Sequence, residues 1–323
     1  MIDINVEHID WLLIRQALSL ALLKNKPVAI HGGPQFLKQH PEYRPLFEDL
    51  SRTTAVMGTG RLACENEILA FEPRPLPPGS HSLESPPLSS AVELLLFLMP
   101  CLLYGDFRSI LNFRGVTHSI ISHPTSFIKE SLLKAIEELG FYASLTLKRF
   151  GFQGSGGGIF ESRIYPHEAK RAQIFSGQSC ALSGVTIFIS HLNTDLAMRE
   201  KFMLAELLGL DENKIAIIEI IDSDGIGNSI QALVSCGGIN VILSRDALVC
   251  NERGGITCDE SDIPAILTGL SDEVKALTGD RVLPEHIIRE LYPYIILSGS
   301  EFDYCGHIPS VALTRDLCKT ILL

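Results

Sequence analysis

The sequence Arg149-Phe-Gly-Phe-Gln-Gly-Ser-Gly-Gly-Gly158 separates two stretches in which apolar and polar residues alternate. Residues 145–150 and residues 159–164 both have the period of two that predicts β-strands. Glycine loses more backbone entropy on folding than any other residue and offers no side chain to pack. The cluster therefore predicts a tight connection or bulge between two strands, where another backbone or a phosphate comes close, with a flexible hairpin as the alternative. It is not a P-loop, because no Lys-Ser or Lys-Thr follows it.

The composition of the chain is that of a globular protein. Its 323 residues are 46% hydrophobic, which is enough for one large domain or two smaller ones. The longest apolar run, residues 91–104, is interrupted by Glu93 and Pro100 and is short for a membrane span. Residues 1–10 carry acidic residues where a signal peptide would be basic. We therefore expect a cytoplasmic protein without a membrane partner.

The cysteines and the net charge indicate where the protein is located and which partners it can bind. The eight cysteines form no CxxC pair, which favours reduced thiols in a cytosolic protein. The formal net charge of −11 argues against a strong general affinity for nucleic acids, because proteins that bind them usually have a basic face. A local basic patch is nevertheless compatible with an acidic total.

Apolar periodicity and turn residues predict the other elements. Helices are expected over residues 14–23, 43–50, 89–104, 122–139, 194–208, 259–277, 285–297 and 312–321. Strands are expected over residues 28–30, 68–71, 110–113, 184–189, 215–221, 230–234 and 241–243. The proline-rich residues 73–87 are expected to form a loop.

The glycine-rich stretch carries a resemblance. Arg149-x-Gly151-Phe152-x-x-x-Gly156-Gly157-Gly158-Ile159 resembles the signature of the RNA 3′-terminal phosphate cyclase family, which has a proline at the position of Gly154. The similarity extends from residue 15 to residue 323 and includes the Leu-x-Pro-x-Leu core of residues 98–102 and the Gly-x-Gly-Asn turn of residues 225–228. The tetrapeptide Arg114-Gly-Val-Thr is most similar to the catalytically silent branch of the family, which takes part in eukaryotic ribosome assembly.

The resemblance implies an α/β fold of the α+β type. Residues 1–180 and 251–323 are expected to form a large domain of repeated units, each with two helices on a four-stranded sheet. Residues 181–250 are expected to form a smaller inserted α/β domain.

The resemblance also implies a chemistry, and this chain departs from it. Family cyclases transfer AMP from ATP to a histidine and then to an RNA 3′-phosphate, and the neighbouring 2′-hydroxyl displaces AMP to leave a 2′,3′-cyclic phosphate. The nucleophile is the second histidine of His-Pro-Ser-Cys-His-Leu-Leu-Thr-Asn. In this chain the similar segment begins at His307 and places Val311 at that position. Valine has no lone pair with which to attack a phosphate.

Two further parts of the family's nucleotide site are altered. Arg289 and Glu290 stand where the family has an aspartate and a glutamine, and Ile9-Asp10-Trp11 replaces its N-terminal glycines. We therefore expect a non-catalytic protein that binds RNA in RNA processing or ribosome assembly, needs no cofactor and has ribosome-assembly proteins as partners. Its location would be the cytoplasm, or the nucleolus for a eukaryotic assembly factor. The alternative is an active cyclase that uses ATP and a divalent metal, with His307 as the nucleophile.

The resemblance assigns the remaining candidate residues. Those expected at RNA or phosphate are Arg15, Lys38, Gln39, His40, Arg114 and Arg149. Those expected to face a retained nucleotide are Pro124, His286, Arg289 and Glu290. If RNA is a partner, the cationic side chains among them, together with Lys148, should gather on one face.

No metal site is predicted. Asp222-x-Asp224 lacks the glycine and glutamate spacing of a calcium-binding EF-hand loop. Cys305 and His307 lack a second pair at zinc-ligand spacing.

Overall fold

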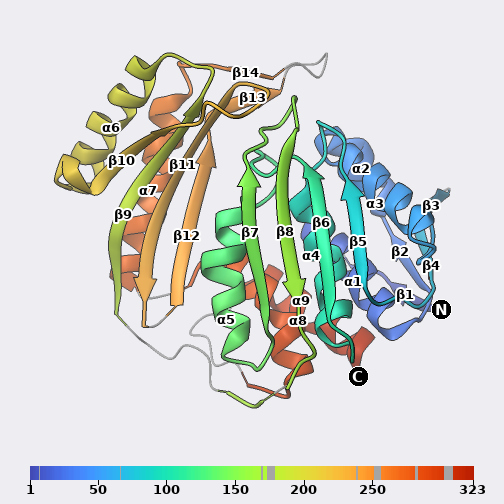
Figure 1. Ribbon diagram of the computed structural model, residues 1–323. Coiled ribbons are helices and arrows are strands. Elements are labelled where there is room, and N and C mark those ends of the chain that lie inside the picture. The colour runs from blue at the N-terminus through green and yellow to red at the C-terminus, as the bar shows by residue number, and fades with distance from the viewer. Residues whose placement is uncertain are drawn as a thin grey trace.

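The computed structural model describes residues 1–6, 8–65, 67–168, 170–172, 179–237, 239–250, 256–280, 283–301 and 308–323 (Figure 1). Within these ranges, helices pack on three four-stranded sheets that stand side by side. The predicted mixed α/β fold is confirmed.

The first two sheets have the same topology. Each contains a parallel pair of strands joined by a helix, and an antiparallel hairpin adds the other two strands, which gives the orders β1-β2-β4-β3 and β5-β6-β8-β7. The first unit consists of β1 (Ile2–Ile4), α1 (Trp11–Lys24), β2 (Val28–His31), α2 (Gly33–Gln39), η1 (Pro41–Tyr43), α3 (Arg44–Val56), β3 (Gly60–Glu65) and β4 (Ile68–Pro73). The second consists of β5 (Ser80–Glu84), α4 (Ala91–Leu103), β6 (Ser109–Gly115), the π-helical turn η2 (Phe127–Leu132), α5 (Leu133–Glu137), β7 (Ala143–Arg149) and β8 (Gly158–Ile164).

Helices α1 and α4 form the centre of the core. Both are apolar on nearly every face, which is the pattern of a helix that is surrounded by protein. They pack on each other, and the Ser19 hydroxyl donates to the Phe97 carbonyl at 2.6 Å. Asp10 caps the start of α1 by accepting from the Leu13 amide at 2.8 Å, and Asn25 ends it in the left-handed conformation.

The third sheet has the order β10-β9-β11-β12. Its elements are β9 (Cys180–Ser190), α6 (Thr194–Leu208), η3 (Glu212–Lys214), β10 (Ile215–Glu219), β11 (Gly227–Cys236) and β12 (Ile239–Asp246). They are followed by the small pair β13 (Leu248–Cys250) and β14 (Ile256–Cys258) and by the helices α7 (Ile263–Asp280), α8 (Glu285–Leu297) and α9 (Pro309–Leu322). Helix α7 packs on the third sheet, whereas α8 and α9 pack on each other and α9 packs on α1.

The boundary of an inserted domain at residues 181–250 stays a prediction. The third sheet packs against elements that precede it and elements that follow it in the sequence. β12 lies against η2, and α7 lies against β9 and β12. The Ile242 amide donates to the Ser131 hydroxyl at 2.8 Å across the first of these contacts.

Two expectations from the sequence are corrected. Residues 73–87 are not only loop, because β5 lies among them and pairs in parallel with β6. Cys180 and Cys236 form a disulfide across the antiparallel pair β9 and β11, so reduced thiols are wrong for this pair. Sequence spacing could not show this pairing, because 56 residues separate the two cysteines.

The described helices contain no candidate for a membrane span. Within the described ranges, none has both the length and the apolar character needed to cross a bilayer.

Candidate functional site

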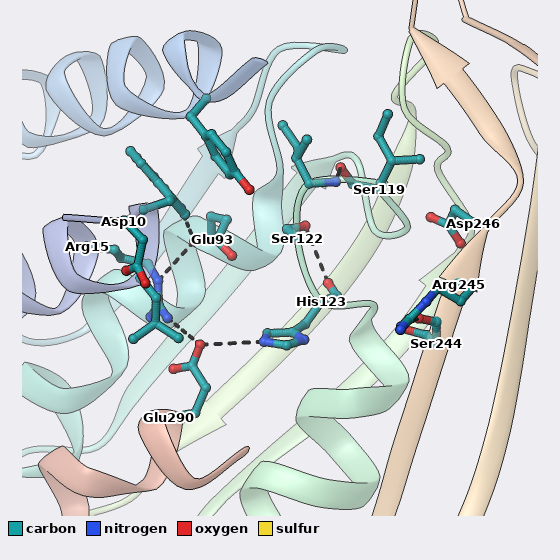
Figure 2. A pocket seen from close by; sticks show the side chains of 15 residues that line it. Asp10, Arg15, Glu93, Ser119, Ser122, His123, Ser244, Arg245, Asp246 and Glu290 are labelled. Atoms are coloured by element: carbon teal, nitrogen blue, oxygen red, sulfur yellow. Dashed lines mark hydrogen bonds and ion pairs between the residues drawn. The ribbon is translucent and has the colours of Figure 1, made fainter. Parts of the chain in front are cut away.

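A cavity of about 500 Å³ opens between helices α1, α4 and α8, the loop before η2 and the end of β12 (Figure 2). Its walls come from the start of α1, from η1, from α4, from the loop before η2, from the end of β12 and from α8. Its lining includes the side chains of Asp10, Trp11, Arg15, Tyr43, Glu93, Ser122, His123, Arg245, Asp246 and Glu290.

A buried ion triad lies at the floor of this cavity. The Arg15 Nε atom lies 3.0 Å from Glu93 Oε2, and its Nη2 pairs with Glu290 Oε1. All three side chains are at most 5% exposed. The Trp11 indole also donates to Glu93 Oε2, at 2.7 Å. One guanidinium is thus held between two carboxylates, which is the arrangement that a buried arginine needs.

The pKa values in the triad follow from burial and from the ion pairs. Burial alone would lower the pKa of Arg15, but Glu290 and Glu93 outweigh it and raise that pKa. Burial raises the pKa of Glu93, while Arg15 and the Trp11 hydrogen bond act in the opposite direction. Arg15 therefore stays charged, and its charge is already matched by protein groups.

Two histidines beside the triad are neutral. His123 Nε2 lies 3.6 Å from Glu290 Oε1, and its ring stacks on Phe127 at 3.9 Å and lies 5.3 Å from His286. Burial lowers the pKa of His123 to about 3, and Arg15 acts in the same direction. Burial, with His123, lowers the pKa of His286 to about 3 as well. Neither imidazole offers a positive charge to a phosphate at neutral pH.

The Arg289 side chain is held between helices and does not line the cavity. Its Nε atom donates to Thr314 Oγ1 at 2.9 Å, its Nη2 pairs with Asp10 Oδ2 at 2.7 Å, and its Nη1 lies 3.3 Å from Glu285 Oε1. Its carbonyl accepts from the Gln16 side chain at 2.7 Å. Arg289 therefore ties α8 to α9 and to the capping residue of α1.

The candidates of the nucleotide site do not all face the same cavity. Of Pro124, His286, Arg289 and Glu290, only Glu290 lines the cavity among the described residues. His286 lines a separate cavity of about 350 Å³ beside α7. Val311 is completely buried in α9 and belongs to the hydrophobic core. His307 lies outside the described residues.

The candidates for RNA contact do not gather into one patch. Arg15 is buried in the triad, and Lys148 pairs with Glu161 at 2.8 Å. Lys38, Gln39 and His40 are exposed at the end of α2 in the first unit, where His40 lies 3.3 Å from Glu42. Arg114 and Arg149 flank Ile159 of β8 in the second sheet, and Arg149 pairs with the Asp224 carboxylate at 2.6 Å.

Sequence reasoning missed Glu93 and Asp246. Glu93 is the single charged residue in the apolar run of residues 91–104, and a charge inside a buried helix requires a partner, so a signal was present. Asp246 had no such signal. It is partly buried at the end of β12, and this loss of solvent raises its pKa to about 6 against the effect of a hydrogen bond from Ser229.

The described parts of the chain contain no cluster of possible metal ligands. No three histidine, cysteine, aspartate or glutamate side chains there lie in an arrangement that could hold a metal ion.

Comparison with known proteins places the chain in a family. The sequence profile of the RNA 3′-terminal phosphate cyclase family matches residues 12–315. The RNA 3′-terminal phosphate cyclase of Koribacter versatilis is 27% identical over 236 residues, which are 68% of this chain and 62% of that protein. The protein of the same name from Pseudomonas fluorescens is 26% identical over 230 residues, which are 67% of this chain and 64% of that protein. The RNA 3′-terminal phosphate cyclase of Methanosarcina barkeri is 23% identical over 302 residues, which are 89% of this chain and 83% of that protein.

The matches to the first two relatives span less than two thirds of their length. The family profile, in contrast, covers nearly the whole of this sequence, and the repeated four-stranded units agree with it. The chain therefore belongs to the RNA 3′-terminal phosphate cyclase family.

Proposed function

We propose that this protein is a cyclase-like member of its family that does not transfer AMP and that binds RNA in RNA processing or ribosome assembly. One observation carries the first half of the proposal. Val311, at the position matched to the nucleophilic histidine, is completely buried within the hydrophobic core. Covalent transfer of AMP requires a side-chain lone pair aimed at the α-phosphate, and valine has none.

The charges of the cavity support the same conclusion. Nucleotidyl transfer requires cations or backbone donors around the phosphates. Arg15 is already held between Glu93 and Glu290, and Arg245 is paired with Glu273. Burial also lowers the pKa of His123 to about 3. A triphosphate does not fit these side chains, so we expect no ATP cofactor and no metal to neutralise it.

The second half of the proposal rests on the family. Its members are named for RNA 3′-terminal phosphate, and RNA is accordingly the inferred partner. The exposed side chains of Arg114 and Lys38 are the cations that support contact with a phosphate backbone. Ribosome-assembly proteins are the further partners in this proposal, and its location is the cytoplasm, or the nucleolus for an assembly factor.

Labelling with ATP tests the absence of nucleotidyl transfer. The protein is incubated with ATP labelled at the α-phosphate and with Mg²⁺, and is then separated under denaturing conditions beside a cyclase that carries the histidine. We expect no label on the wild type. We also expect none on Val311→His, because Arg15 stays paired with Glu93 and Glu290.

The alternative makes the opposite claim. If His307 is the nucleophile, the wild type becomes labelled and His307→Ala abolishes the label, which overturns the proposal. The RNA half is tested by fluorescence anisotropy with a labelled oligonucleotide at low salt. Absence of binding there contradicts RNA as the partner.

A further inference from the structure

The Arg149 guanidinium is held by a turn from the third sheet. Its Nη2 and Nη1 atoms bond Asp224 Oδ1 and Oδ2 at 2.6 and 3.0 Å, which is a bidentate pair. Its Nε donates to Asp222 Oδ1 at 3.0 Å, and Nη1 also donates to the Gly157 carbonyl at 3.1 Å. Asp222 and Asp224 lie in the connection between β10 and β11, so the contact joins residues more than 70 positions apart in sequence.

The glycine-rich stretch is shaped to receive this turn. Gly157 has a φ of +75°, and a Cβ atom there would lie 1.9 Å from Asp224 Oδ2. In the opposite direction, a Cβ on Gly225 would lie 1.9 Å from the Ser155 hydroxyl, and one on Gly227 would lie 2.5 Å from the Phe152 ring. The absence of side chains on both partners therefore lets the two segments touch.

Two further basic side chains lie near the Asp224 carboxylate. Arg149 has the largest effect in lowering the pKa of Asp224, and Arg114 and His191 act in the same direction. Arg114 is exposed at the end of β6, and His191 follows β9, with its Nε2 atom 2.9 Å from the Ser223 carbonyl. In the sheet register Arg114 and Arg149 both pair with Ile159 of β8, one from each side, and His191 contacts the turn itself through Ser223. Three basic side chains therefore lie at this end of the second sheet, beside the turn.

We propose that Arg149, Arg114 and His191 form a binding site for the phosphate groups of RNA, and that the Asp222–Asp224 turn masks this site as an internal mimic of phosphate. The inference rests on the proposed RNA binding. A planar guanidinium accepts a carboxylate and a phosphate with the same two-pronged geometry, so one can replace the other.

The exposure of the pair makes the exchange feasible. The side chain of Asp222 is 79% exposed and that of Asp224 is 47% exposed, and ion pairs that water can reach contribute little to stability. The turn is nevertheless part of the same chain, so its effective concentration at Arg149 is high. A single phosphate ion should therefore compete poorly, whereas a polyanion with several contacts should displace the turn.

Two substitutions test the mask without changing its shape. Asp222→Asn with Asp224→Asn keeps the size of both side chains and removes their charges. We expect this variant to bind a labelled uridine oligonucleotide about tenfold more tightly than the wild type at low salt, since two exposed ion pairs no longer compete. We also expect its affinity to fall more steeply with salt, because more counterions are released on binding.

A matched control separates the mask from net charge. Glu212→Gln with Glu260→Gln removes the same two charges from exposed positions that do not contact Arg149. We expect this control to bind like the wild type, within about twofold. Adding Arg149→Gln to the Asn variant should abolish the gain. An equal gain in the control overturns the inference, and so does a folded Asn variant without any gain.

A second probe distinguishes this inference from the proposed function. Inorganic tripolyphosphate, followed by calorimetry, reports the anion site without RNA. Tripolyphosphate binding by the Asn variant alone, with no RNA binding by any variant, supports the masked site and contradicts the RNA proposal. No tripolyphosphate binding by the Asn variant overturns the masked site. Should the double variant fail to fold, the single variant Asp224→Asn keeps the Asp222 pair, and it must still bind tripolyphosphate more tightly than the wild type for the inference to stand.

Discussion

At the scale of single residues, the carboxylate at position 290 decides how the charge of Arg15 is matched. The family resemblance implies an amide at this position, which would leave Arg15 with one buried carboxylate as its partner. In this chain Glu290 supplies a second carboxylate, and both carboxylates are buried with Arg15. The guanidinium has become part of the core.

Removal of the Arg15 side chain tests this role. Arg15→Ala leaves Glu93 and Glu290 buried without their cation, and we expect a loss of about 3–5 kcal/mol in the free energy of unfolding. Glu290→Gln keeps Arg15 paired with Glu93, so its loss should be far smaller. Urea denaturation of both variants measures the difference. Arg61→Ala, which breaks an exposed pair with Glu65, is the control and should change little. Equal losses for Arg15→Ala and Glu290→Gln would show that the triad does not act as described.

The sequence could indicate only part of this site. Arg15 and Glu290 were found because each falls in register with a family motif on its own helix. Glu93 and Asp246 reach the same cavity from α4 and from the end of β12. Their approach is set by how three sheets pack, and no local pattern encodes it.

At the scale of elements, local signals predicted those elements whose ends are fixed locally. The helix over residues 194–208 was predicted with the bounds that α6 has, because Asn193 caps its start and Gly209 ends it in the left-handed conformation. β5 was missed because its strand character comes from pairing with β6, while prolines flank it in sequence. The strands predicted on either side of the glycine-rich stretch are confirmed as the antiparallel pair β7 and β8, and a register shift between Leu147 and Arg149 lies just before the glycines. The partners of this stretch, Gly115 and the Asp222–Asp224 turn, could not be read from it.

The glycines that bring these elements together should not tolerate a methyl group. A Cβ on Gly158 would lie 2.6 Å from the Gly115 carbonyl oxygen and 2.7 Å from the Gly151 amide nitrogen, and backbone atoms cannot move aside cheaply. We expect Gly158→Ala to lower the free energy of unfolding by more than about 2 kcal/mol. Gly269→Ala is the matched control in α7, where a Cβ meets nothing within 4 Å. That change should stabilise the protein by about 0.5–1 kcal/mol, because alanine favours a helix. Thermal unfolding followed by circular dichroism compares the two, and equal effects would refute the close approach.

At the scale of the whole molecule, acidity is the dominant property, and it extends into the interior. The net charge is −11, and a buried carboxyl group lies on α6 in addition to those in the cavity. Glu200 on α6 is completely buried, and its Oε1 accepts from the Asn228 side chain at 2.6 Å. Glu200 Oε2 and Asn228 Oδ1 have no other partner in the described structure. A proton on the carboxyl group supplies a donor that this pair otherwise lacks.

Glu200 and Asp246 should make the folded protein less stable as the pH rises. Burial raises the pKa of Glu200 from 4.5 to about 7, against the effect of the Asn228 hydrogen bond, and Asp246 is shifted in the same direction. A carboxyl group with a raised pKa in the folded state binds more protons folded than unfolded between those two values. The free energy of unfolding is therefore highest below the pKa that the group has in the unfolded chain. It falls as the pH rises through the pKa that the group has in the folded protein.

The expected result is a decrease of about 2–3 kcal/mol in the free energy of unfolding between about pH 5 and pH 8 from Glu200. Glu200→Gln offers the same shape, a donor for Asn228 Oδ1 and no charge, so it should flatten this dependence and be the more stable protein at the upper end. Urea denaturation across the pH range measures both effects, with the exposed change Glu212→Gln as the control for net charge. A dependence that stays as steep in Glu200→Gln as in the wild type would show that Glu200 is ionised in the fold, and that the buried pair is held by a carboxylate.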